Sequence, residues 1–358
     1  MILSRYLVKA FLSRFTMLLV GLVLFLQTLD LLATADEIMA GGGDAMASLA
    51  RYVMLRAPSL IETVAPLATL LGALTAMVGM ATTSEILAMR AAGLSVLRLV
   101  GGLVGVGLAM SLLLFAFSEA IVVPSNSELQ GWRDDGFRSG EQPAQTGENS
   151  WVMEGSTFIR VGNVLRDGAE LINVRLFIPG TSGEIAEIIS IGRALWDNNA
   201  WTTSDMSRLH GPGGSDSAPL TWQTQLRPEH FIRFSNHPNE LSLNALQQYI
   251  GDVAIRSRPG YFYDTWVHQK FAGPIVLALM PLLAAIAAFA HHRQGSSVVT
   301  VVWGISIGFA FIVIDNIVLA MGQFGSLPPM LAAWLPIALF GTLGLWLVFS
   351  LEHTGART

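Results

Sequence analysis

Six runs of about 20 apolar residues constrain this chain more than any other feature of its sequence. A helix of about 20 apolar residues is long enough to cross the hydrocarbon core of a bilayer. Charged residues make up 13% of the chain, against roughly 25% in soluble domains. The sequence therefore predicts a multi-pass membrane protein. The predicted spans cover about 15–35, 58–81, 97–122, 265–290, 297–320 and 329–350.

The stretch between the third and fourth spans has a different character. It contains the alternating runs STFIRVG, INVRLFI, EIIS and HFIRF, separated by turn signals such as RDG, DNN and GPGG. Alternation with a period of two residues is typical of antiparallel strands with one buried face. We therefore expect an α-helical membrane bundle of six transmembrane helices with an inserted all-β, jelly-roll-like domain.

These patterns divide the chain into three parts. Residues 1–124 hold the first three spans and a short polar helix at 82–95, residues 125–262 form the β-domain, and residues 263–358 hold the last three spans.

Lys and Arg residues near the span ends predict the orientation, because they concentrate on the cytoplasmic side. Most of them fall on one side of a six-span topology, while Arg51 and Arg56 oppose the pattern in a loop that also carries three acidic residues. Both termini are then cytoplasmic and the β-domain is periplasmic, as expected of an inner-membrane protein. The residues that agree are Arg5, Lys9, Arg14, Arg90, Arg98 and Arg293.

Several chemistries find no support in the sequence. The chain has no cysteine and a net charge of −5, which argues against thiolate chemistry and a nucleic-acid partner. The patterns for a P-loop, a zinc protease and a serine hydrolase are absent. The adjacent His291 and His292 do not share a helix face, which disfavours a metal site. We expect no enzyme activity, metal or cofactor in this chain.

The polar stretch 82–95, TTSEILAMRAAGLS, lies between two long apolar runs. Thr82 and Glu85 have the spacing of a capping box, and Gly93 fits a helix end. About 10 helical residues would extend about 15 Å. Such a helix could fill a groove on another protein, or it could be a simple turn that places Arg90 among lipid headgroups.

Several motifs occur in a fixed order along the chain: SRYLVKAFL, APSLIETVAPLATLLGAL, SEILAMRAAGLS, GISIGFAFIVIDNIV and GSLPPMLAAWLPIALF. Together they resemble the LptF/LptG permeases of the lipopolysaccharide-export ABC transporter over nearly the whole chain. The last two spans are more similar to the LptG branch of this family than to the LptF branch.

The resemblance implies partners and a role for the stretch 82–95. This stretch would be a coupling helix that docks on a cytoplasmic ATPase dimer of the LptB type, which would bind ATP and Mg²⁺. The chain would also pair with a second six-span permease of the LptF type, and with periplasmic jelly-roll proteins of the LptC and LptA types. The implied docking residues are Ser84, Glu85, Leu87, Met89, Arg90 and Gly93.

The resemblance also implies a lipopolysaccharide path with a lateral gate beside spans one and five. Candidates for this path are Asp30, Asp36, Glu37, Phe311 and Asp315. Some relatives carry lysines at the outer end of the first span, around residues 29–39, whereas this chain has acidic residues there. Asp315 could instead form a structural hydrogen bond between helices, together with Asn316.

In the β-domain, alternation should turn one face inward. Candidates for that face are Phe158, Val161, Leu176, Ile178 and Trp222. They could form a closed core, or they could line the acyl-chain path that the resemblance implies.

The resemblance thus predicts a permease subunit that extracts lipopolysaccharide from the inner membrane and passes it to a periplasmic β-jelly-roll bridge toward the outer membrane. Two alternatives from other classes stay open: a secondary transporter, and a non-transporting scaffold that presents a periplasmic β-domain.

Overall fold

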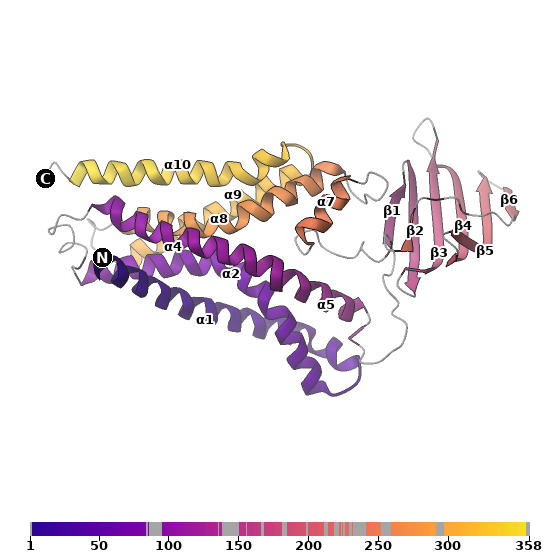
Figure 1. Cartoon of the computed structure of the whole chain (residues 1–358), viewed down its shortest axis with the longest axis horizontal. Helices are drawn as coiled ribbons and strands as arrows, with labels where there is room; N and C mark the ends of the chain where they lie inside the picture. The colour runs from indigo at the N-terminus through magenta and orange to yellow at the C-terminus, as the bar shows by residue number, and fades with distance from the viewer. Residues whose placement is uncertain are drawn as a thin grey trace. The chain divides into compact units, whose positions relative to one another are not determined.

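The computed structural model describes residues 2–83, 85, 95–134, 136–137, 150–154, 156–165, 168–180, 185–197, 200–210, 214–217, 222, 224, 226–228, 231, 241–251, 259–290 and 297–355. The helices are α1 (Ile2–Ala40), α2 (Ala45–Thr82), α4 (Val96–Phe117), the π-helical turn η1 (Ser118–Val122), α5 (Val123–Asp134), α7 (Leu243–Gly251), α8 (Gly260–Ala290), α9 (Ser297–Gln323) and α10 (Pro329–Gly355). The strands are β1 (Ser150–Glu154), β2 (Thr157–Leu165), β3 (Glu170–Pro179), β4 (Ile185–Asp197), β5 (Ala200–His210) and β6 (Gly214–Ser217) (Figure 1).

The chain forms two compact units. Unit 1 comprises Met1–Leu32, Arg56–Pro124 and Asp264–Thr358, and unit 2 comprises Ala33–Leu55 and Ser125–Tyr263. Unit 2 therefore contains one end each of α1 and α2 in addition to the β-strands. The segment 125–262 also contains helix, because α5 extends to Asp134 and α7 lies at Leu243–Gly251.

The six predicted spans are confirmed within the described residues. Six helices there are long and apolar enough to cross a membrane: Tyr6–Ala40, Ala45–Thr82, Leu97–Arg133, Gly260–Ala288, Val298–Gln323 and Pro329–Ser350. The first helix begins at Ile2, well before the apolar run at Phe15, because Leu7 and Phe11 already pack into the core of unit 1. The predicted fold class, a helical membrane bundle with an inserted β-domain, is confirmed.

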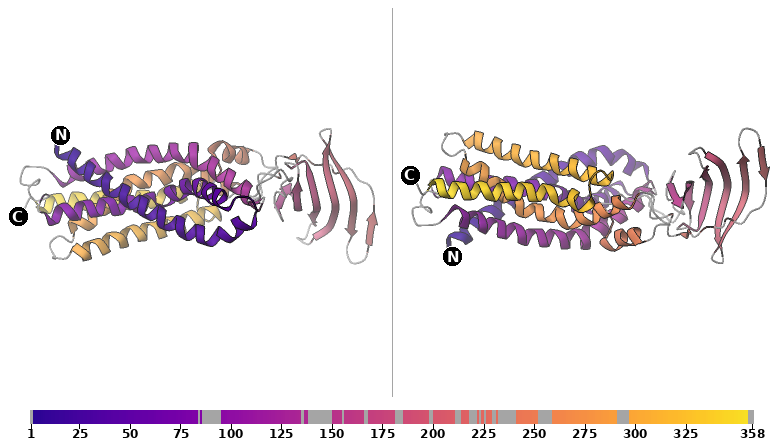
Figure 2. Two further views of the ribbon diagram at one scale, coloured as in Figure 1. Left: turned by 90° about the horizontal axis from the view of Figure 1, so that it is seen from below. Right: turned by 90° about the horizontal axis from the view of Figure 1, so that it is seen from above.

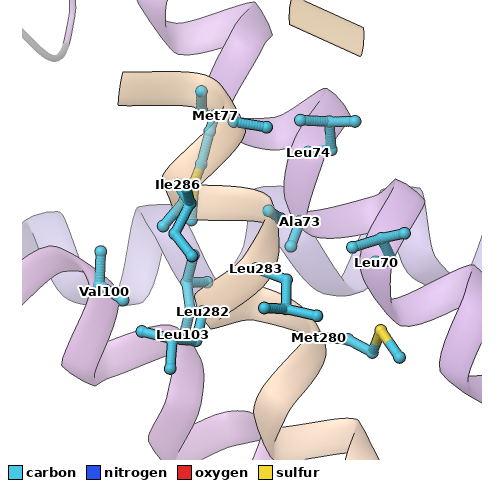
Figure 3. Close-up of a cluster of buried hydrophobic side chains, with 14 of the residues drawn as sticks. Leu70, Ala73, Leu74, Met77, Val100, Leu103, Met280, Leu282, Leu283 and Ile286 are labelled. Carbon is cyan, nitrogen blue, oxygen red and sulfur yellow. The ribbon is translucent and has the colours of Figure 1, made fainter. Parts of the chain in front are cut away.

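Helices α2 and α8 form the centre of unit 1. In the most apolar stretch of each helix, buried residues make up 78% in α8 and 61% in α2, against 6% in α1 and 22% in α9. Figure 3 shows Ala73 and Met77 of α2 beside Leu283 and Ile286 of α8. Leu70 and Leu74 of α2 lie against Gly308 and Gly304 of α9 instead. Because lipid tails are as apolar as these side chains, close packing rather than the hydrophobic effect holds such a bundle together.

Helix α4 approaches the backbone of α8 at a glycine. A Cβ atom added at Gly107 would lie 2.6 Å from the carbonyl oxygen of Leu277 and 2.7 Å from the Cα of Ala278. Small residues allow helices this close an approach. The contact therefore depends on the missing side chain at Gly107.

Helices α4 and α5 continue into one another through the π-turn η1 (Figure 1). The amide of Val123 donates to the carbonyl of Ser118, five residues earlier. Pro124 follows directly, and in an α-helix its ring would collide with the carbonyl of Ala120. The wider π-turn relieves that collision, which explains why it lies at this place.

The described strands of unit 2 form one antiparallel sheet. The six strands follow the order β1-β2-β3-β4-β5-β6, so every neighbour in sequence is a neighbour in the sheet. Figure 2 shows the strands side by side in a twisted layer. This meander arises because short turns join strands whose alternating pattern gives them one common buried face.

A row of four residues crosses the middle strands at one level: Gly162, Asn173, Gly192 and Asp205. The registers on either side place these four opposite one another. Asn173 and Asp205 both have φ of 55°, a left-handed conformation that Asn and Asp tolerate. A Cβ atom at Gly162 would lie 2.8 Å from the Cβ of Asn173, and one at Gly192 would lie 2.9 Å from the Cβ of Asp205. The glycines leave room for the local bend of the opposing strands.

One face of the sheet carries the core of unit 2. Ile159, Val174 and Ile191 are buried there, and Trp222, Leu226 and Phe231 cover them. Burying such side chains stabilises a water-exposed domain by about 1.5–3 kcal/mol each. The core therefore uses the hydrophobic effect, in contrast to that of unit 1.

Candidate functional site

Glu85 lies just beyond the end of α2 and is held by two hydroxyl groups. Its Oε1 accepts a hydrogen bond from Thr83 Oγ1 at 3.0 Å and one from the Tyr6 hydroxyl of α1 at 3.5 Å. Its Oε2 is buried and has no hydrogen-bond partner among the described residues. Buried carboxylate oxygens normally accept a hydrogen bond.

The predicted capping box at this place is wrong. Thr82 is the last residue of α2, and its hydroxyl donates to the Gly79 carbonyl at 2.8 Å. Glu85 contacts the Thr83 hydroxyl instead of reaching back to Thr82. The other predicted docking residues, Ser84, Leu87, Met89, Arg90 and Gly93, lie outside the described residues.

Helix α4 begins with a side-chain cap that was not predicted. Ser95 has extended backbone angles, and its side chain accepts a hydrogen bond from the amide of Arg98 at 3.2 Å. A serine directly before an apolar run is the available sequence signal for such a cap. Ser95 therefore fixes where α4 starts after the stretch 82–95.

Asp30 of α1 binds Arg56 of α2. The Arg56 Nε donates to one carboxylate oxygen at 3.2 Å, Nη2 approaches the other at 3.4 Å, and Nη1 donates to Ser59 Oγ at 3.2 Å. Both side chains are about one-quarter exposed, at 26% and 29%. Arg56 thus meets the predicted path residue Asp30, and the pair joins the two helices.

The other predicted path residues have different surroundings. Asp36 and Glu37 are exposed and belong to unit 2. Phe311 is only 1% exposed and packs edge-on against Phe340, with ring centroids 5.3 Å apart. Asp315 is half-buried on α9. Within unit 1, Asp30, Phe311 and Asp315 therefore have separate surroundings.

The alternative interpretation of Asp315 was a hydrogen bond between helices together with Asn316, but the hydrogen bond of the Asn316 side chain lies within its own helix. The Asn316 Nδ2 donates to the Ile312 carbonyl of α9 at 2.8 Å.

A charge cluster of Glu62, Ser118, Glu119 and Lys270 joins three elements of unit 1. Lys270 Nζ of α8 donates to Glu119 Oε1 of η1 at 2.7 Å, and the Lys270 side chain is 7% exposed. The Ser118 hydroxyl donates to the carboxylate of Glu62 on α2, and Glu62 also interacts electrostatically with Lys270 and Glu119. No local pattern in the sequence predicts this cluster, although charges inside apolar spans are a signal of function.

The five candidates for the inner face of the β-domain do not all share that face. Val161 is 0% exposed, Leu176 and Trp222 are each 6% exposed, and Ile178 packs against this core. Phe158 is 48% exposed, so its assignment to the buried face is wrong. Phe158 and Val161 are three positions apart, and in a strand an odd spacing places two side chains on opposite faces.

Among the described residues, no group of three or more His, Cys, Asp or Glu side chains could hold a metal ion. Asp30 with Arg56, and Glu62 and Glu119 with Lys270, instead connect helices of unit 1. Such an arrangement joins and positions helices.

Comparison with known proteins shows similarity to lipopolysaccharide export permeases along nearly the whole chain. A family model described as lipopolysaccharide export system permease LptF/LptG matches residues 5–349. The chain is 26% identical to the lipopolysaccharide export system permease protein LptG of Escherichia coli K12 over 356 residues, which is 97% of this chain and 98% of that protein. It is 25% identical to the LptG protein of Haemophilus influenzae over 309 residues, or 83% and 84% of the two chains.

The match includes both units, the helical bundle and the inserted sheet. Membership of a permease family also implies a transport subunit in the inner membrane rather than a catalytic enzyme. The chain therefore belongs to the LptF/LptG family of lipopolysaccharide export permeases.

Proposed function

We propose that this chain is the LptG-type permease subunit of an ABC transporter that extracts lipopolysaccharide from the inner membrane. It passes the lipid to a periplasmic bridge of β-jelly-roll proteins of the LptC and LptA types. The observation that carries this proposal is the family match over residues 5–349. Both LptG relatives are named for lipopolysaccharide export.

In this proposal a partner protein supplies the energy for transport by hydrolysing ATP. A cytoplasmic ATPase dimer of the LptB type binds ATP and Mg²⁺, and a second six-span permease of the LptF type completes the membrane part. The stretch 82–95 docks on the ATPase, and Glu85 takes part in the contact. Its support is the position of Glu85 just beyond α2, inside the stretch that resembles the coupling helix of this family, where an Arg or Lys of a partner could pair with the carboxylate.

Purification with the chain as bait tests the assembly. We expect a P-loop ATPase, a second six-span protein and ATP-dependent release of lipopolysaccharide to an acceptor β-protein. Recovery of the chain alone with ion-driven transport would favour a secondary transporter. An envelope function that survives without any ATPase would favour a scaffold.

Substituting Glu85 tests the docking role. Glu85→Arg places a cation where the proposal requires an anion, so ATPase recovery should fall at least about tenfold, as for the loss of a charged interface contact. Glu128→Arg is the matched control, because Glu128 is an exposed carboxylate that pairs with Arg51 in unit 2. Full ATPase recovery with Glu85→Arg would contradict the docking role.

The acyl chains of the lipid pass along the core face of the sheet in this proposal. Ile178 lies partly buried at the margin of that core, whereas Phe158 lies exposed on the other face. A photo-crosslinking side chain at Ile178 should capture lipopolysaccharide during ATP turnover, and the same group at Phe158 should not. Equal capture at both positions would exclude a path on the core face.

A further inference from the structure

The charge cluster holds two carboxylates and one ammonium group. Lys270 of α8 bonds directly to Glu119 of η1, while Glu62 of α2 takes a hydrogen bond from Ser118. Lys270 attracts both carboxylates. In an apolar bundle an unpaired charge is costly, so the two carboxylates compete for one cation.

The π-turn offers a way to exchange these partners. Ser118 and Glu119 are consecutive residues of η1, and one bonds Glu62 while the other bonds Lys270. A π-turn closes its hydrogen bonds over five residues and an α-turn over four. Conversion between the two shifts the side chains around the helix axis by the equivalent of one residue, which would move Glu119 away from Lys270.

Unmade hydrogen bonds lie on the same side of α8. Trp266 Nε1 and Gln269 Oε1 are buried without a partner in the described part of the chain. Trp266, Gln269 and Lys270 have the spacing of one helix face. Each unmade bond at a buried group costs about as much as the bond would contribute, so an arrangement that pairs these atoms would gain stability.

From these observations we propose that Lys270 exchanges between Glu119 and Glu62, and that this exchange, together with the π-turn, sets the position of α4 against α8. Glu62, Glu119 and Lys270 are then positioning residues for transport that need not touch the lipid. Their role in transport rests on the function proposed above. The exchange itself is a property of unit 1.

The decisive variant is Glu62→Gln. It keeps a side chain that accepts from Ser118 and removes the competing charge, so Lys270 should stay on Glu119. Lipopolysaccharide released per ATP hydrolysed should fall roughly tenfold, within the usual range for a lost coupling between two states, while the ATPase is still recovered. Glu128→Gln, which removes an exposed carboxylate of unit 2, should leave this ratio unchanged.

A distance measurement separates positioning from plain stability. The chain contains no cysteine, so spin labels at Ile121→Cys in η1 and Val267→Cys in α8 report only on this contact. We expect two distance populations in the otherwise unchanged assembly and one population with Glu62→Gln. Glu119→Gln should leave Lys270 with Glu62 and give a single population at the second distance. If Glu62→Gln does not fold, the distance measurement on Glu119→Gln tests the exchange instead.

A single population without any substitution, or an unchanged release ratio with Glu62→Gln, would overturn the exchange. Neither result would affect the proposed function as long as the unsubstituted assembly exports lipopolysaccharide. Conversely, two populations in an assembly that hydrolyses ATP but moves no lipopolysaccharide would leave the exchange standing and refute the function.

Discussion

At the scale of single residues, the two units use polar groups in different ways. In unit 2, Trp201 is 1% exposed, and its Nε1 donates to the Leu226 carbonyl at 2.7 Å. Its ring also lies against Trp222 and Phe231, with centroids 5.6 and 5.5 Å away. One side chain thus fixes the segment that covers the sheet, through a hydrogen bond and through ring contacts.

Trp201→Phe should loosen this cover. It leaves the buried Leu226 carbonyl without its donor, at a cost of about 1–3 kcal/mol. Hydrogen–deuterium exchange on the full-length protein should show faster exchange in β2 to β5. Trp196→Phe is the control, because Trp196 is only half-buried and contacts the same ring. Equal exchange in the two variants would show that the hydrogen bond contributes little.

The missed charge cluster belongs to the same scale. Glu62, Glu119 and Lys270 are visible in the sequence as charges within or beside apolar spans. Glu119 and Lys270 are 151 positions apart in the chain, so no local pattern shows that they meet. The misplaced Phe158 is a different case, because its odd spacing from Val161 in the sequence already indicated that the two side chains lie on opposite faces of the sheet.

At the scale of elements, close approach of backbones matters more than apolar character. Helix α4 carries Gly101, Gly102, Gly105 and Gly107, and their apolar surroundings are alike in the sequence. A Cβ atom would meet nothing within 4 Å at the first three, whereas at Gly107 it would meet the backbone of α8. Only one of these glycines is therefore required by packing.

Gly107→Val should push α4 away from α8 and lower the stability of the bundle. Overpacking of this kind typically costs about 1–3 kcal/mol. The thermal unfolding midpoint of the purified protein in detergent measures the effect. Gly105→Val makes the same change on the same helix where a side chain has room, and it should change the midpoint little. A similar loss in both variants would contradict the close α4–α8 contact.

At the scale of the whole molecule, the distribution of charge predicts which side of the membrane each connection faces. Lys and Arg cluster near Thr83 and the N-terminus, while the connection from α9 to α10 around Ser326 carries no charge. The positive-inside rule therefore predicts that Thr83 is cytoplasmic and that Ser326 and the strands are periplasmic.

Single cysteines in this cysteine-free chain test that orientation. Thr83, Ser156 and Ser326 are all exposed. A membrane-impermeant maleimide should label Ser156→Cys and Ser326→Cys from the periplasmic side, and it should label Thr83→Cys only after the membrane is opened. The unsubstituted chain gives the background. Labelling of Thr83→Cys in sealed cells would contradict the predicted orientation and favour the opposite one.

The sequence by itself determined the six spans, the inserted β-strands and the family. Each of these depends on patterns that are local along the chain: apolar length, alternation and short motifs. Only the tertiary structure decided which helices lie at the centre, which face of the sheet is buried, and which charges pair. Those features join residues far apart in sequence, such as Lys270 with Glu119, and a contact of that kind exists only once packing has brought its two halves together.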